Sequence, residues 1–197
     1  MRVVGIVIAG GQSRRMGAEK TLLQIGDQTI LQRTLERLSA QVDQVALNAN
    51  GNVDRLAAFG LPIIPDRRTD LGTPLAGLHA GLSWAVEHDF DHVVTVPSDC
   101  PFLPADLVGR FTRRPTRPTI AASLGQCHFL TGLWPTRCLD LLGEAIDQRH
   151  LRSMKSWASA AQVEIETWQA EKFDPFFNVN TPDDLAEAVQ IAAEFSA

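Results

Sequence analysis

The chain has 197 residues, 45% of them hydrophobic, and carries a formal net charge of −5 with a pI near 5.5. A chain of this length and composition can bury one sizeable core, so we expect a single domain over residues 1–197. The acidic balance argues against a nucleic-acid binder or a protein of anionic membranes, because both need a broad basic face. The opening apolar run is too short to span a bilayer and lacks a cleavage pattern, which predicts a first strand and a cytoplasmic location.

The three cysteines, Cys100, Cys127 and Cys138, show neither Cys-x-x-Cys nor His-rich spacing. This pattern argues against a disulfide framework or a structural zinc site. We expect each cysteine to be a small buried or half-buried filler.

The first twenty residues predict a strand that ends in a phosphate-binding loop. A β-branched run over 3–8 leads to Gly10 and Gly11, and small, polar and basic residues follow as far as Lys20. Adjacent glycines let the backbone bring N–H groups against an anion, while Arg15 and Lys20 supply positive charge. The spacing fits neither the Walker loop nor the dinucleotide-binding glycine pattern. By itself, the motif could also be an ordinary Gly-rich turn with solvated arginines.

Three more strands are expected in the first half of the chain. In order, the pattern predicts a helix over 29–40, a strand over 44–47, a short helix over 52–59, a strand over 61–64, a helix over 74–87 and a strand over 91–96. Strands that alternate with helices predict an α/β, Rossmann-like three-layer fold with a parallel sheet. Ligands of such sheets bind outside the carboxyl ends of the strands. The residues expected along that crevice are Gly10, Gly11, Asn48, Asp66 and Asp99.

The second half is less regular and predicts antiparallel additions to the sheet. We expect helices over 104–113, 135–148 and 151–161, strands over 119–123 and 127–133 joined by a tight turn at Gly125, and an edge strand over 163–168. Thr181 is expected to cap a terminal helix that begins with Pro182, and the acidic Asp183 and Asp184 complement the positive end of that helix.

Asp99 is the strongest candidate for a metal ligand. It follows a predicted strand and precedes a proline-rich turn that sets its direction. Magnesium prefers hard oxygen ligands and is usually held by one or two carboxylates together with substrate phosphates. The alternative is that Asp99 only caps its turn or the next helix.

Other polar candidates have structural alternatives as well. Asp66 could be a salt-bridged loop residue, and Asn48 could belong to a turn formed by Asn-Ala-Asn-Gly. Asn178 and Asn180 are spaced so that both point to one side of an extended segment, where they could simply bind neighbouring backbone. His128 and the basic residues near 150 are of types that are usually solvated when isolated.

Two motifs resemble a known family. The order apolar-Ala-Gly-Gly-x-Ser-x-Arg-Met-Gly-x-x-Lys resembles the signature of nucleotidyltransferases that join a nucleoside monophosphate to a phosphorylated acceptor, and its double glycine is similar to that of the molybdenum cofactor guanylyltransferases. The segment Asn-x-Asn-Thr-Pro-Asp-Asp-Leu over 178–185 resembles the one that closes their active site. Thr73 and His150 depart from the family, which has glycine at both positions. The resemblance spans residues 6–185.

The resemblance implies a nucleotidyltransferase fold with a nucleotide-binding half, about 1–110, and an acceptor-binding half, about 111–197. It implies transfer of GMP from GTP to molybdenum-bound molybdopterin with release of pyrophosphate, and it suggests molybdenum-insertion proteins and apo-molybdoenzymes as partners. The implied roles are nucleotide binding by Ile8, Ala9, Gly10, Gly11, Lys20, Asn48, Asp66 and Asp99; catalysis by Arg15, Lys20 and Asp99; acceptor binding by Arg152, Asn178 and Asn180; and Mg²⁺ binding by Asp99 and Asn180.

Two other functions remain open from the sequence. One is a related enzyme with another base or acceptor, such as a molybdopterin cytidylyltransferase or a sugar-phosphate nucleotidyltransferase. The other is a non-catalytic nucleotide-binding module. The Ala-Gly-Gly loop favours the guanylyltransferase over the first, and the presence of both Lys20 and Asp99 favours an enzyme over the second.

Overall fold

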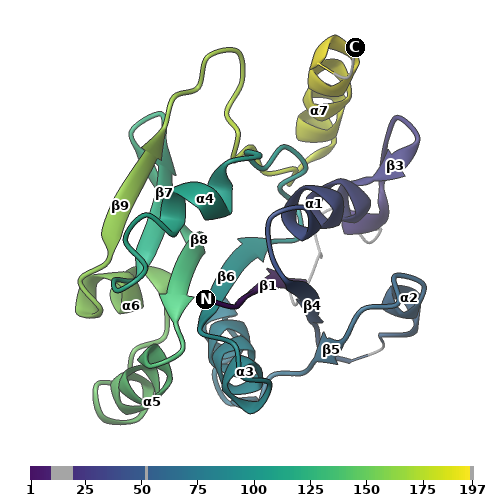
Figure 1. Ribbon diagram of the computed structural model, residues 1–197. Coiled ribbons are helices and arrows are strands. Elements are labelled where there is room, and N and C mark those ends of the chain that lie inside the picture. The colour runs from purple at the N-terminus through teal and green to yellow at the C-terminus, as the bar shows by residue number, and fades with distance from the viewer. Residues whose placement is uncertain (10–19, 52, 196–197) are drawn as a thin grey trace.

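The computed structural model describes residues 1–9, 20–51 and 53–195. They form an α/β structure around a seven-stranded sheet with the strand order β5-β4-β1-β6-β8-β7-β9 (Figure 1). The strands are β1 (Val3–Ile8), β4 (Gln44–Asn48), β5 (Ile63–Ile64), β6 (His92–Pro97), β7 (Thr119–Ser123), β8 (Gln126–Pro135) and β9 (Glu164–Trp168).

The sheet has a parallel part and a mixed part. Strand β1 lies between β4 and β6, β5 pairs with β4, and all four run parallel. Strand β8 is antiparallel to both β6 and β7, while β9 runs parallel to β7 at the edge. This arrangement confirms the predicted α/β fold, a mostly parallel sheet with antiparallel strands in the second half of the chain.

Helices cover both faces of the sheet. Figure 1 shows α3 (Pro74–Glu87), α5 (Cys138–Gln148) and α6 (Met154–Ala160) on one side and α1 (Ile30–Ser39) and α4 (Leu107–Phe111) on the other. Because successive side chains of a strand point to opposite faces, Val4 and Ile6 of β1 pack toward α3 while Val3 and Val7 pack toward α1. Burial on both faces explains why β1 is an unbroken apolar run.

A third group of elements lies beyond α1. It contains η1 (Lys20–Leu22), the hairpin of β2 (Gln24–Ile25) and β3 (Gln28–Thr29), and α7 (Pro182–Phe195), while α2 (Asp54–Ala57) follows β4. Ile25 of the hairpin packs with Ile191 of α7 and with Phe102 in a separate apolar cluster. Among the described residues, none of the helices is long and apolar enough to cross a bilayer.

Several predicted boundaries were wrong, mostly near prolines. Pro135 ends β8, where it pairs with His92, so the next helix begins at Cys138 and not at 135. The helix predicted over 104–113 is restricted to Leu107–Phe111, and the strand predicted over 61–64 to Ile63–Ile64. The helix predicted from 151 begins at Met154, because the Ser153 hydroxyl accepts a hydrogen bond from the Ser156 amide and caps it there.

The β2–β3 hairpin was not predicted. Its two-residue turn contains Gly26, whose φ of +69° is in the left-handed region that glycine adopts readily. The Gly26-Asp27 pair, which lies between the short segments Gln24-Ile25 and Gln28-Thr29, was the sequence signal that could have predicted this hairpin. The turn at Gly125, by contrast, was predicted, and both Leu124 and Gly125 have the positive φ of a tight hairpin turn.

Candidate active site

The carboxyl ends of the parallel strands lie level with one another. Ile8 at the end of β1 pairs with Asn48 on one side and with Pro97 on the other. The alignment continues past the strands, since the Ala9 amide donates to the Asn48 carbonyl oxygen (2.8 Å) and the Ser98 amide donates to the Ile8 carbonyl oxygen (3.2 Å). The residues that follow β1, β4 and β6 therefore meet at one edge of the sheet.

Asn48 and Asp66 meet at this edge. Asn48 is buried, and its Nδ2 donates to the Ile64 carbonyl oxygen (3.0 Å) and to Oδ1 of Asp66 (2.9 Å). Asn50 adds two more bonds, because its Nδ2 donates to Oδ2 of Asp66 (2.7 Å) and its Oδ1 accepts from the Asp66 amide (2.8 Å). Each carboxylate oxygen of Asp66 is thus held by one amide hydrogen bond, Oδ1 by the buried Asn48 and Oδ2 by Asn50. Sequence reasoning missed Asn50; its position two residues after Asn48 was the available signal.

Helix α3 lies against this network at Gly77. A β-carbon at Gly77 would lie 2.3 Å from Oδ1 of Asn48 and 3.0 Å from Cδ1 of Ile8. Interiors at close-packed density cannot absorb such an overlap, so the close approach of α3 requires glycine here. The N-terminus of a helix favours negative charge, and α3 begins three residues earlier, at Pro74. The Thr73 hydroxyl before it is buried and has no hydrogen-bond partner among the described residues.

Asp99 follows β6 and contacts a segment from the far end of the chain. Its carbonyl oxygen accepts a hydrogen bond from the Val179 amide (3.0 Å). The thiol of the neighbouring Cys100 donates to Oδ1 of Asn178. Val179 is buried, whereas Asn178 and Asn180 on either side of it are exposed, as the predicted alternation requires. The structure therefore brings Asn178 and Asn180 to the strand end that carries Asp99.

The first turn of α7 holds the end of this segment. The Asp184 amide donates to Oγ1 of Thr181 (3.1 Å), which confirms Thr181 as the helix cap. In return, the Asp184 carboxylate accepts from the amides of Asn180 (2.7 Å) and Thr181 (2.8 Å).

Arg152 lies in another part of the molecule, at the end of α5. Its guanidinium donates to the carbonyl oxygens of Ile146 (3.1 Å) and Leu151 (2.9 Å) and so covers the last turn of that helix. Ile146 and Leu151 belong to the core on the α3 side, whereas Val179 packs in the cluster beside α7. The predicted acceptor residues thus come from two separate places.

The backbone conformation of His150 explains why the family has glycine at this position. Its φ is +53°, in the left-handed region that glycine adopts without strain and other residues rarely adopt. The chain turns here so that the Leu151 amide reaches the Ala145 carbonyl oxygen (3.2 Å). The departure at His150 therefore keeps the backbone path of a glycine.

A charged cluster joins the loop after β5 to α5. Arg68 donates to Asp147 (2.6 Å), and this bond lowers the pKa of the Asp147 carboxyl. Nearby His79 of α3 has its pKa lowered by burial, and the charges of Arg68 and Arg67 lower it further. Its Nδ1 is buried and has no hydrogen-bond partner within the described part of the chain. The histidine is therefore neutral at neutral pH.

Several predicted phosphate-binding residues cannot be placed. Gly10, Gly11 and Arg15 lie outside the described residues. Lys20 begins η1, but its side chain is outside the described part as well. Of the predicted loop motif, the structure thus locates Ile8, which is buried, and Ala9, which is half-buried.

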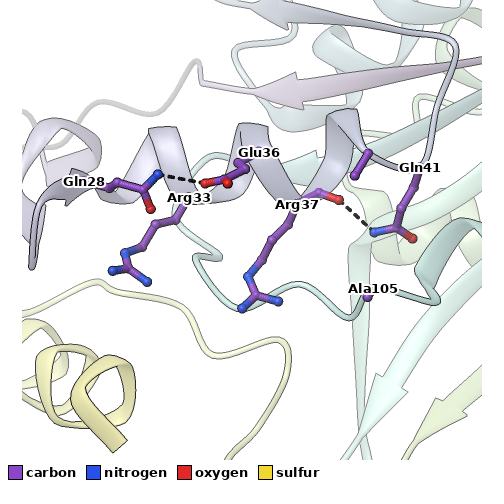
Figure 2. Close-up of a pocket in the computed structure, with 7 residues that line it drawn as sticks. Gln28, Arg33, Glu36, Arg37, Gln41 and Ala105 are labelled. Atoms are coloured by element: carbon purple, nitrogen blue, oxygen red, sulfur yellow. Dashed lines mark hydrogen bonds between the residues drawn. The ribbon is translucent and has the colours of Figure 1, made fainter. Parts of the chain in front are cut away.

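A surface pocket of about 350 Å³ lies elsewhere, between α1 and the loop that contains Ala105. Figure 2 shows Arg33 and Arg37 extending from α1 in the same direction, with Gln28 bonded to Glu36 (2.7 Å) and Gln41 bonded to the Arg37 carbonyl oxygen (2.9 Å). None of the predicted site residues lines this pocket. We therefore place the candidate active site at the strand ends and not in this pocket.

A mostly parallel sheet whose strand ends gather an oriented aspartate, a second aspartate and a helix N-terminus has the arrangement in which α/β proteins bind their ligands. Among solved structures, molybdopterin-guanine dinucleotide biosynthesis protein A from Archaeoglobus fulgidus superposes with a TM-score of 0.73 at 24% identity, covering 98% of this chain and 100% of that one. A nucleotidyl transferase from Methanothermobacter thermautotroptrophicus gives a TM-score of 0.74 at 18% identity, with 98% of each chain covered. At these identities the likeness shows the fold.

Sequence comparison identifies the family. The model of the MobA-like NTP transferase domain matches residues 5–163. A molybdenum cofactor guanylyltransferase of Rhodopseudomonas palustris (strain BisB5) is 41% identical over 95% of this chain and 92% of its own. One from Rhizobium leguminosarum bv. trifolii (strain WSM2304) is 43% identical over 94% and 91%, respectively. The chain belongs to the MobA-like NTP transferase family, and it is a nucleotidyltransferase, as its motifs predict.

Proposed function

We propose that this protein transfers GMP from GTP to the terminal phosphate of molybdenum-bound molybdopterin, which yields the guanine dinucleotide cofactor and pyrophosphate. The observation that carries the proposal is the meeting of Asp99 with the 178–180 segment, in a chain about 40% identical to guanylyltransferases over nearly its whole length. An enzyme that joins two phosphorylated molecules needs a nucleotide site and an acceptor site on either side of one reacting centre. In this proposal, the nucleotide site would lie on one side of Asp99 and the amides of Asn178 and Asn180 would hold the acceptor on the other.

The chemistry requires little proton transfer. The acceptor phosphate is already anionic, so the barrier lies in bringing two anions together and dispersing charge at the α-phosphorus. The N–H groups of Gly10 and Gly11, with Arg15 and Lys20, would hold the triphosphate. Ile8 and Ala9, at the end of β1, would contact the nucleotide just before this loop.

Asp66 is suited to read the nucleoside. Each of its carboxylate oxygens accepts one amide hydrogen bond inside the protein and keeps a further lone pair for a guanine N–H or a ribose hydroxyl. Asn48 and Asn50 orient that carboxylate. Directional groups of this kind reject a base with the wrong donors, so we expect GTP to be preferred over ATP and CTP. Thr73, in place of the family's glycine, presents a buried hydroxyl close to the same helix start.

The donor types near the end of β6 suit Mg²⁺. The Asp99 carboxylate would hold it together with the amide oxygen of Asn180, whose segment is bonded to the Asp99 backbone through Val179, and both are hard oxygen ligands. A bound Mg²⁺ would neutralise charge that develops on the phosphates. We further expect the enzyme to act in the cytoplasm and to meet molybdenum-insertion proteins and apo-molybdoenzymes.

One experiment separates the alternatives. The pure protein is incubated with Mg²⁺, metal-loaded molybdopterin and each of the four NTPs in turn, and the products are identified by mass. A GMP adduct formed with GTP alone is the expected result. Equal product with CTP would identify a cytidylyltransferase, and GTP binding without any product would identify a nucleotide-binding module.

A further inference from the structure

The segment of residues 174–180, here called the strap, is fixed at both ends. At its start, Oδ1 of Asp174 accepts hydrogen bonds from the Ser123 hydroxyl (2.7 Å) and from the Phe176 amide (2.9 Å). The Asp174 carbonyl oxygen accepts from the Phe177 amide (3.0 Å). One residue thus ties the strap to the end of β7 and also sets the first turn of the strap itself.

His128 completes this anchor. Nε2 of His128 lies 2.7 Å from the Ser123 hydroxyl oxygen, and its ring packs on Phe176 with the ring centroids 4.7 Å apart. Serine has one hydroxyl hydrogen, and Asp174 takes it, so Nε2 of His128 must be the donor to Ser123. Ser123 is fully buried. The order of donors is therefore fixed, from His128 through Ser123 to Asp174.

The topology places this anchor at the same edge of the sheet as the candidate active site. Strand β7 is antiparallel to β8, and β8 is antiparallel to β6. The carboxyl end of β7, where Ser123 lies, is therefore on the same edge of the sheet as the carboxyl end of β6, where Asp99 follows. The strap runs along that edge from Ser123 to Asp99 and then enters α7.

The strap must keep its register to present its amides. Phe176 and Val179 are buried, while Asn178 and Asn180 are exposed on either side of Val179, whose amide is bonded to Asp99. Because side chains alternate along an extended segment, a slip by one residue would turn Val179 outward and both asparagines inward. Apolar burial alone is non-directional, so it does not exclude such a slip. The hydrogen bonds of Asp174 fix the register at the start of the strap, through the amides of Phe176 and Phe177, and those of Asp184 fix it at the end.

We propose that Asp174, held by Ser123 and His128, is a positioning residue that sets Asn178 and Asn180 against Asp99 for use of the acceptor. The proposal rests on the proposed function, since the acceptor is the substrate that these amides would hold. Neither Asp174 nor His128 is assigned a contact with the reacting atoms. Both act through the register of the strap.

The test compares Asp174→Ala with Asp174→Asn. The asparagine Oδ1 can still accept both hydrogen bonds, whereas alanine accepts neither. We expect Asp174→Ala to lower kcat/KM for molybdopterin at least tenfold while the Kd for GTP stays within twofold of the parent, and Asp174→Asn to stay within threefold in both. Glu166→Ala is the control for general loss of stability, because Glu166 is also half-buried and bonded, to Arg110 (2.7 Å), on the neighbouring strand β9. This control should behave like the parent.

A second readout does not depend on turnover. Hydrogen exchange of the Val179 amide reports directly on its bond to Asp99, and it should be faster in Asp174→Ala but not in Asp174→Asn or Glu166→Ala. Parent-like exchange and parent-like acceptor use in Asp174→Ala would overturn the proposal, as would an equal loss of GTP and acceptor binding. If the alanine variant does not fold, Ser123→Ala removes one of the bonds and takes its place. If the parent itself makes no product, the proposed function fails, while the exchange measurement still decides whether Asp174 positions the strap.

Discussion

The two sides of the candidate active site are built differently. On the side proposed for the nucleotide, here called the nucleotide side, Asn48, Asn50 and Asp66 lie at or just after the ends of neighbouring parallel strands, and their mutual hydrogen bonds span 16 to 18 residues of sequence. On the side proposed for the acceptor, here called the acceptor side, the strap reaches Asp99 from far along the chain, and the contact between Cys100 and Asn178 spans 78 residues. The first arrangement follows from the sheet itself. The second depends on a few side-chain contacts, so it can be broken while the sheet remains intact.

Asp99 belongs to both sides, and its replacement should have the largest effect. Asp99→Ala removes the carboxylate but keeps the carbonyl oxygen that holds Val179, so both sides should stay in place. We expect kcat to fall by about 10²–10³-fold, as when one preorganised charge-stabilising group is lost. Steady-state kinetics with Mg²⁺ measure the loss, and an unchanged Tm is the control. Near-normal turnover would exclude Asp99 as the metal ligand.

Gly77→Ala should damage only the nucleotide side. The new β-carbon would meet Oδ1 of Asn48, so the helix or the amide must move, at a cost of about 1–3 kcal/mol. We expect weaker GTP binding together with a lower free energy of unfolding. Gly143→Ala is a matched control, because Gly143 is also helical but its β-carbon would meet nothing within 4 Å; it should stabilise the protein by about 0.5–1 kcal/mol. If Gly77→Ala lowered the free energy of unfolding equally in the parent and in an Asn48→Ala background, the overlap with Asn48 would not be the cause.

Two half-buried histidines, His79 and His128, should both make the protein less stable in mild acid. Burial lowers the pKa of His79 and of His128 below the ordinary value of 6.5. Below that value the unfolded chain takes up protons that the folded chain does not, so the free energy of unfolding should fall as the pH drops from 6.5 toward about 5, before carboxylates titrate. Urea unfolding across this range measures the slope. His79→Gln and His128→Gln should each flatten this slope. A slope unchanged in both variants would contradict the assignment of the acid sensitivity to these histidines.

The smallest effect is expected at His150, which follows α5 and lies away from the strap. The left-handed conformation costs a non-glycine residue about 1–2 kcal/mol, and glycine costs about 0.5–1 kcal/mol through the entropy of the unfolded chain. His150→Gly should therefore stabilise the protein by about 0.5 kcal/mol, measurable by urea unfolding. Gln162, with a φ of +51° after α6, offers a matched site where the same substitution should act alike. Destabilisation at His150 alone would mean that its side chain makes a contribution beyond its backbone.

The sequence predicted the nucleotide side better than the acceptor side. Parallel strands place the residues that follow them at one edge by topology alone, so the neighbourhood of Asn48 and Asp66 could be inferred from strand order. The pairing of Asn50 with Asp66 could not be inferred in this way, because it depends on the conformations of two loops. For the strap, the alternation of Asn178 and Asn180 was visible, but its anchor at Asp174 joins three elements that no local pattern connects. His128 was set aside as a solvated histidine, although its ring is half-buried.

The grouping of Arg152 with the two asparagines was an inference from the family motif, and no contact in the structure joins them. A basic residue near a helix end has two uses that sequence cannot separate, to bind an anion or to cover carbonyl groups. In this chain Arg152 donates to two carbonyl oxygens, one of them from the last turns of α5. Its predicted role in acceptor binding stays a prediction.

The bond from Val179 to Asp99 also has a consequence for the order of folding. The strands that carry Asn48, Asp66 and Asp99 all lie within the first hundred residues, so their pairing can begin while the rest of the chain is still being synthesised. The strap must close a much longer loop, which costs more entropy before its contacts form. A growing or partly refolded chain should therefore acquire the shape that holds a nucleotide before it can present the asparagines to an acceptor.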